Sequence, residues 1–140
     1  MESKLEILIN EFNKKEDILL IYLFGSYSKE TQNKLSDIDF AILLHQNAKD
    51  FYFNKQMEYL GLLIDIFRRD DIDLVILNSA PLLLQFKVVK SGKLIYAKNE
   101  LTRIRFEENV IRNYLDMKSL YDYYNKYLIR RIDEGKFGVR

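Results

Sequence analysis

Residues 24–40 read FGSYSKETQNKLSDIDF and join two predicted strands. The apolar run that leads into them, ILLIYLF at residues 18–24, is short and continuous, as in a strand buried on both faces. A Gly25-Ser26 pair breaks this run, and a second strand, predicted over residues 37–44, opens with two carboxylates spaced one residue apart. The sequence therefore predicts a sharp turn and an acidic pair at the junction of two consecutive buried strands.

Three aspartates are candidates for one metal site. Asp37 and Asp39 are predicted to project from the same face of a strand, with Cα atoms roughly 6.7 Å apart. Asp73 lies at the start of another apolar strand, predicted over residues 72–77. If these strands pair, the three carboxylates repel one another, and no Lys or Arg lies nearby on the strands to compensate them. Oxygen ligands of this kind favour Mg²⁺, with Mn²⁺ as the alternative.

Each motif also has a plainer interpretation. A single Asp-x-Asp is more often a pair of exposed charges, and a Gly-Ser after a strand is more often an ordinary turn. Asp71, two residues before Asp73 on the same face, is expected to be an exposed charge and ranks below Asp73. The combination favours a site, because the acidic pair follows the Gly-Ser break and a third carboxylate opens a later strand.

The Gly25-Ser26 pair suits a phosphate group. Glycine lets the backbone turn sharply and approach a ligand closely. Ser26 is expected at the start of a short helix within residues 28–33, where free N–H groups and the helix dipole favour an anion.

Helices are predicted on both sides of the strands. Apolar residues recur at helical spacing over residues 3–15, 51–67 and 101–132, and a further helix is expected between Pro81 and Gly92. Residues 94–96 are expected to form a short edge strand. This order predicts an α+β fold with a small mixed sheet flanked by helices.

The chain is expected to form one domain. Residues 1–98 are predicted as its core, residues 99–134 as a long C-terminal helix packed on that core, and residues 135–140 as a flexible tail. Apolar residues between Val110 and Leu128 alternate in steps of four and three, and this seam is expected to be core packing rather than an interface.

Composition excludes several classes of function. The 140 residues contain no cysteine and a single histidine, His45, which argues against thiolate zinc sites and Ser-His-Asp triads. The net charge of +1 gives no strong attraction to nucleic acid or to an anionic membrane. No apolar run approaches the roughly 20 residues that cross a bilayer, and no signal core follows Met1, so a cytoplasmic protein is expected.

The spacing of Gly25-Ser26, ten intervening residues and Asp37-Ile38-Asp39 resembles the signature of the DNA polymerase β-like nucleotidyltransferases. Asp73 matches their third carboxylate. The resemblance implies the nucleotidyltransferase fold, with Gly25 and Ser26 holding the nucleotide phosphates and the three aspartates holding two Mg²⁺ ions and carrying catalysis.

Most of the chain further resembles the minimal nucleotidyltransferases, the MNT or MntA-like antitoxins that pair with HEPN toxins. That resemblance implies transfer of AMP from ATP to a tyrosine of a HEPN ribonuclease toxin, within a heteromeric complex and with no direct nucleic-acid substrate. Many members carry arginines after Gly-Ser, whereas Tyr27-Ser28-Lys29-Glu30 stands here, so arginine contacts to the triphosphate cannot be transferred to these positions.

Two other functions remain open at this stage. A small-molecule nucleotidyltransferase of the aminoglycoside type would use the same motif, but it usually needs a further substrate-binding domain. A non-catalytic antitoxin would neutralise the toxin by binding alone, with the long C-terminal helix as its main contact.

Overall fold

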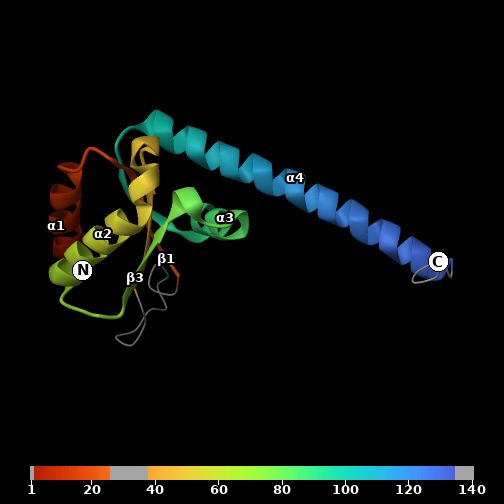
Figure 1. The fold of residues 1–140 in the computed structure, drawn as a ribbon, viewed down its shortest axis with the longest axis horizontal. Coiled ribbons are helices and arrows are strands. Elements are labelled where there is room, and N and C mark those ends of the chain that lie inside the picture. Colours follow the sequence, from red (N-terminus) through yellow and green to blue (C-terminus); the bar gives the residue numbers. More distant parts are fainter. Residues whose placement is uncertain (1, 26–37, 135–140) are drawn as a thin grey trace.

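The computed structural model describes residues 2–25 and 38–134 (Figure 1). Ser26 and Asp37, the helix expected within residues 28–33 and the tail expected at residues 135–140 lie outside these ranges. The described elements, in chain order, are α1 (Glu2–Asn13), β1 (Ile18–Phe24), β2 (Ile38–Leu44), η2 (Gln46–Phe51), α2 (Tyr52–Phe67), β3 (Ile72–Ile76), η3 (Leu77–Ser79), α3 (Leu82–Ser91), β4 (Lys93–Ala97) and α4 (Glu100–Asp133).

The strands form one mixed sheet in the order β3-β2-β1-β4. β1 pairs antiparallel with both β2 and β4, and β2 pairs parallel with β3. The end of β1 therefore lies beside the starts of β2 and β3, at one end of the sheet. The predicted α+β fold is confirmed, with strand bounds within about one residue of those expected from the sequence.

Helices cover both faces of the sheet, which explains why its central strands are continuous apolar runs. Side chains of α1 and α2, such as Leu8 and Leu63, form one buried cluster with alternate strand residues that include Phe40. The other strand residues form a second cluster with Val88 of α3 and Phe106 of α4. Figure 1 shows α1 and α2 on one side of the strands and α3 on the other.

Only the first part of α4 packs on the body of the protein. Val110 is 2% exposed, and the ring of Tyr114 stacks on Phe86 of α3 with centroids 3.7 Å apart. Further along, Tyr121 and Tyr124 are 64% and 57% exposed, so the prediction that the whole seam is core packing is wrong beyond Tyr114. The reason is length, because a helix of 34 residues is about 50 Å long and extends past the 10-residue α3 beneath it (Figure 1).

Among the described residues, no helix combines the length and the apolar character that crossing a membrane requires.

Candidate active site

Asp39 and Asp73 lie directly opposite each other on neighbouring strands. The parallel register of β2 and β3 pairs these two residues, and strand spacing puts their Cα atoms about 5 Å apart. Their neighbours along the strands, Phe40 and Leu74, point into the cluster on the α1 and α2 side. Both carboxylates therefore project from the face that α3 and the start of α4 cover.

Gly25 makes room for the carboxylate of Asp39. Its φ of +80° lies in the left-handed region, and a Cβ atom built there would stand 2.4 Å from Oδ2 of Asp39. No real Cβ contact is this short, so any other residue would displace either the turn or the carboxylate. The break after β1 is thus shaped around an acidic side chain of β2.

The predicted metal site is described only in part. Asp39 is half-buried and Asp73 is exposed at the start of β3, whereas Asp37 and Ser26 lie outside the described residues. Within residues 2–25 and 38–134, no three acidic or histidine side chains gather closely enough to hold a metal ion. The two adjacent carboxylates, with space preserved by Gly25, supply oxygen atoms of the type that a hard divalent cation binds.

Arg69 brings a positive charge to the same end of the sheet. Its Nε and Nη2 atoms donate to the two carboxylate oxygens of Asp71, at 2.8 and 2.5 Å. The backbone carbonyl of Asp71 accepts from Ile38 N, which fixes this residue beside the start of β2. The Arg69 guanidinium lowers the pKa of the Asp71 carboxyl below its ordinary value, so Asp71 is ionised at neutral pH.

This ion pair corrects the sequence analysis in one respect, because Asp71 is not a fully exposed charge. Strands β2 and β3 contain no basic residue, as the sequence indicates, and the positive charge of Arg69 comes from the turn before β3. The sequence signal was the RRDD run at residues 68–71, which has the composition of a solvated turn. Arg69 and Asp71 are two positions apart in the turn between α2 and β3, and only the structure shows that their side chains pair.

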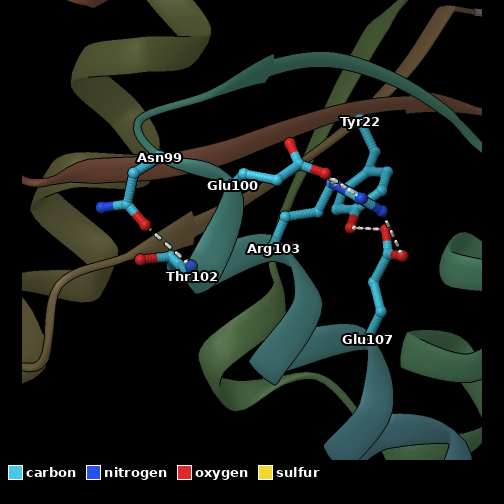
Figure 2. A network of polar contacts seen from close by, with 6 residues as sticks. All are labelled: Tyr22, Asn99, Glu100, Thr102, Arg103 and Glu107. Carbon is cyan, nitrogen blue, oxygen red and sulfur yellow. Dashed lines mark hydrogen bonds and ion pairs between the residues drawn. The ribbon is translucent and has the colours of Figure 1, made fainter.

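A polar network anchors α4 on the face that carries the two carboxylates (Figure 2). Tyr22 of β1, 1% exposed, donates its hydroxyl proton to Oε2 of Glu107 at 2.6 Å. Nη1 of Arg103 donates to the other oxygen of Glu107 at 2.9 Å, and the same guanidinium contacts Glu100. Burial and the hydrogen bond to Glu107 raise the pKa of Tyr22 well above its ordinary value.

A cavity of about 570 Å³ lies at the opposite end of the strands, next to Leu19 and Leu43. It contains no carboxylate among its lining residues, so we place the candidate active site at the Asp39 end. The polar residues that line the cavity are His45, Gln46, Asn78, Lys98, Asn99 and Thr102.

The candidate active site is thus a pair of adjacent carboxylates beside a glycine turn, at one end of a small mixed sheet. Residues 6–101 match the family described as "Polymerase beta, Nucleotidyltransferase". The match covers more than half of the chain, and the protein belongs to this family.

Relatives with a known activity show similarity to part of the chain. The protein adenylyltransferase MntA of Shewanella oneidensis is 38% identical over 81 residues, which are 58% of this chain. The aligned region spans 55% of the length of that protein.

Solved structures share the fold over nearly the whole chain. A toxin-antitoxin crystal structure with AMP-PNP contains a chain that is 29% identical, with a TM-score of 0.66 and coverage of 91% of this chain and 98% of that chain. The structure of a tri-AMPylated Shewanella oneidensis HEPN toxin in complex with an MNT antitoxin matches at 25% identity and a TM-score of 0.63, over 91% of this chain and 98% of that chain. The nucleotidyltransferase fold expected from the sequence is thereby confirmed.

Proposed function

We propose that this protein is an antitoxin that transfers AMP from ATP to a tyrosine of a partner HEPN toxin and so neutralises it. The observation that carries the proposal is the pairing of Asp39 with Asp73 beside the Gly25 turn. The name of the Shewanella oneidensis relative and the AMPylated toxin in the similar complex support the choice of nucleotide and acceptor.

We assign the roles of the residues from the family resemblance and, for Gly25, Asp39 and Asp73, also from their positions. Asp37, Asp39 and Asp73 would hold Mg²⁺, with two ions in the full site, and Gly25 with Ser26 would hold the terminal phosphates of ATP. When bound, the metal neutralises phosphate charge and lowers the pKa of the acceptor hydroxyl. The metal set and the role of each residue are our assignment for this chain.

The transfer is a substitution at the α-phosphorus of ATP. The oxygen of the tyrosine hydroxyl forms a bond to that phosphorus, the bond to the pyrophosphate oxygen breaks, and pyrophosphate leaves with the electron pair. Asp73, exposed at the start of the edge strand, is our candidate acceptor for the hydroxyl proton. Positioning and charge neutralisation should supply most of the rate, as in other phosphoryl transfers.

A second candidate function is neutralisation of the toxin by binding alone, without transfer of AMP. The exposed side chains on the outer part of α4 favour this function. Leu120, Tyr121 and Tyr123 are 71%, 64% and 72% exposed on a helix that extends away from the body. Aromatic side chains such as tyrosine are enriched in protein interfaces. This function would need no carboxylate.

Labelling with ATP tests the catalytic proposal. The purified partner toxin, Mg²⁺ and labelled ATP are mixed with wild-type protein or with the Asp39→Asn variant. We expect the variant to transfer AMP at least about a hundredfold more slowly, because it lacks a charge that positions the metal. Asp65→Asn, the same change at an exposed residue of α2, is the matched control and should label at the wild-type rate.

The result separates the two candidates. Wild-type labelling by a folded Asp39→Asn variant contradicts the catalytic assignment. If the Asp37→Asn/Asp39→Asn double variant still protects cells that express the toxin, binding is sufficient for neutralisation.

A further inference from the structure

Helix α2 carries a row of apolar side chains that runs from the core onto the surface. The row consists of Phe53, Met57, Leu60 and Ile64. Its steps of four, three and four residues place all of its members on one face of the helix. Leu60 and Ile64 pack against the buried cluster of the sheet, whereas Phe53 and Met57 are 70% and 46% exposed. The two exposed side chains form an apolar patch at the start of α2.

The contacts of α2 show which way this patch faces. Lys55 forms an ion pair with Asp17, in the chain between α1 and β1, with 3.5 Å between the ammonium nitrogen and Oδ2. Phe53 and Met57 are each two residues from Lys55, which puts them about 160° around the helix axis from it. The patch therefore lies on the flank of α2 that faces away from α1 and β1.

That flank adjoins the edge strand that carries Asp73. Strand β3 ends the sheet, and no strand in the described part of the chain pairs with its outer side. Gln56 of α2 donates to the backbone carbonyl of Leu74 at 2.6 Å, which fixes the start of the helix over this strand. Asp73 is exposed one residue before Leu74. The apolar patch and Asp73 thus lie at the same edge, on opposite faces of the sheet.

The order of the strands directs an acceptor of AMP to this edge. From β1 to β3 the groups of the candidate site are Gly25, Asp39 and Asp73. The proposed function assigns the terminal phosphates of ATP to Gly25. Attacking and leaving oxygens lie in line in phosphoryl transfer, so the acceptor hydroxyl belongs on the far side of the α-phosphorus, towards Asp73. A protein that presents this hydroxyl covers the outer edge of β3.

We propose that Phe53 and Met57 bind an apolar surface of the toxin next to its acceptor tyrosine, and so hold that tyrosine at Asp73. The inference rests on the adenylyl transfer proposed above. Phenylalanine and methionine are among the residues enriched in protein interfaces, and a few such side chains carry most of the binding energy. Because only one strand separates the patch from Asp73, a single toxin surface that wraps around the edge contacts both.

Transfer kinetics at increasing toxin concentration, with saturating Mg²⁺ and ATP, test the inference. We expect the Phe53→Ser/Met57→Ser variant to raise KM for the toxin about tenfold or more and to keep kcat within about twofold, because it loses binding that is equal in the ground and transition states. Its KM for ATP should equal that of the wild-type protein. The matched control is Ile7→Ser/Leu83→Ser, which removes two apolar side chains that are 49% and 61% exposed on α1 and α3 and should leave all of these constants unchanged.

The kinetic constants separate docking from other roles of the patch. An unchanged KM for the toxin in the folded double variant overturns the inference, as does an equal rise in the control variant. A fall in kcat without a rise in KM also overturns it, because the patch would then act on the site and not on binding. If the wild-type protein transfers no AMP to the toxin, the proposed function itself fails.

Cross-linking gives a second measurement that does not depend on the double variant. The chain contains no cysteine, so Phe53→Cys provides a single attachment point for a photoactivated cross-linker. In the complex we expect it to cross-link to the toxin, whereas the same label at Ile7→Cys should not. Cross-links from position 53 to a second copy of this chain, or equal toxin cross-linking from both positions, would overturn the inference.

Discussion

Gly25 and Asp39 belong together at the scale of single residues, because one provides the space that the other occupies. We expect Gly25→Ala to destabilise the protein by about 1–2 kcal/mol, since a Cβ atom is disfavoured at a left-handed φ. The same variant should slow AMP transfer about a hundredfold, because the Asp39 carboxylate must move away from the new methyl group. Urea unfolding and labelled-ATP transfer measure the two effects.

Gly61 provides the matched control. It lies within α2, and no atom stands within 4 Å of a Cβ atom built there. Gly61→Ala should stabilise the protein by roughly 0.5–1 kcal/mol, since glycine is the poorer residue inside a helix, and should leave transfer unchanged. A Gly25→Ala variant with normal transfer would show that the Asp39 carboxylate does not need its present position.

The residue-scale geometry of the site could be predicted only where strand periodicity determines it. Alternation along β2 and β3 places Asp39 and Asp73 on the face opposite Phe40 and Leu74, and the structure confirms that orientation. The position of Arg69 could not be predicted in this way, because a turn has no periodicity and its contacts depend on where the neighbouring helix ends. The places of Asp37 and Ser26 in the site remain predictions.

At the scale of elements, the contact between Tyr22 of β1 and Glu107 of α4 makes the free energy of unfolding decrease as the pH rises into the alkaline range. The fold raises the pKa of Tyr22 above its usual value of about 10, so the unfolded chain loses this proton first as pH rises. The stabilising effect of the contact is present below pH 10 and is lost above it, by about 1.4 kcal/mol per pH unit for one tyrosine.

Tyr22→Phe isolates this effect. The variant should be less stable by about 1–2 kcal/mol at pH 7, because Glu107 loses a buried hydrogen bond. The gap to wild type should narrow between pH 10 and 11 in urea unfolding experiments, since the variant has one fewer titrating tyrosine. A gap that stays constant over this range would mean that the pKa of Tyr22 is not raised.

The two parts of α4 should contribute very differently to stability. Val110→Ala removes apolar volume from a site that is 2% exposed and should cost about 1.5–3 kcal/mol. Leu120→Ala, in the same helix at a site 71% exposed, should change the free energy of unfolding by less than about 0.5 kcal/mol. Urea unfolding measures both changes. If the two substitutions lower the free energy of unfolding by similar amounts, the outer part of α4 must pack against the body of the protein in solution.

Element boundaries were largely predictable from the sequence, whereas the packing of α4 was not. Apolar periodicity locates both ends of α4 to within about one residue of Glu100–Asp133. The seam from Val110 to Leu128 continues along the whole helix, and periodicity cannot tell a seam that meets the core from one that faces solvent. What decides this is the extent of α3 beneath it, which is a property of the assembled fold.

At the scale of the whole molecule, the sheet order β3-β2-β1-β4 is what makes a site from distant parts of the chain. Residues 25, 39 and 73 are separated by long stretches of sequence, yet they lie at one end of three adjacent strands. The sequence indicates a small mixed sheet but leaves its order open, since the strand connections fit several arrangements. The strand pattern makes Asp73 a partner of Asp39 only if the two strands pair, and the resemblance to a family added the match to a third carboxylate.

Ligand binding at this edge should stabilise the entire domain. The acidic side chains repel one another in the free protein, and Mg²⁺ with ATP should relieve that repulsion. At a ligand concentration of about 100 times Kd, binding adds about 2.7 kcal/mol, which for a domain of this size raises Tm by roughly 10 °C. Asp39→Asn should start with an equal or higher Tm, because it lacks one of the repelling charges, and should gain almost nothing from Mg²⁺ and ATP. Chelation of Mg²⁺ should remove the gain of the wild-type protein, and an equal gain in both proteins would place the nucleotide away from Asp39.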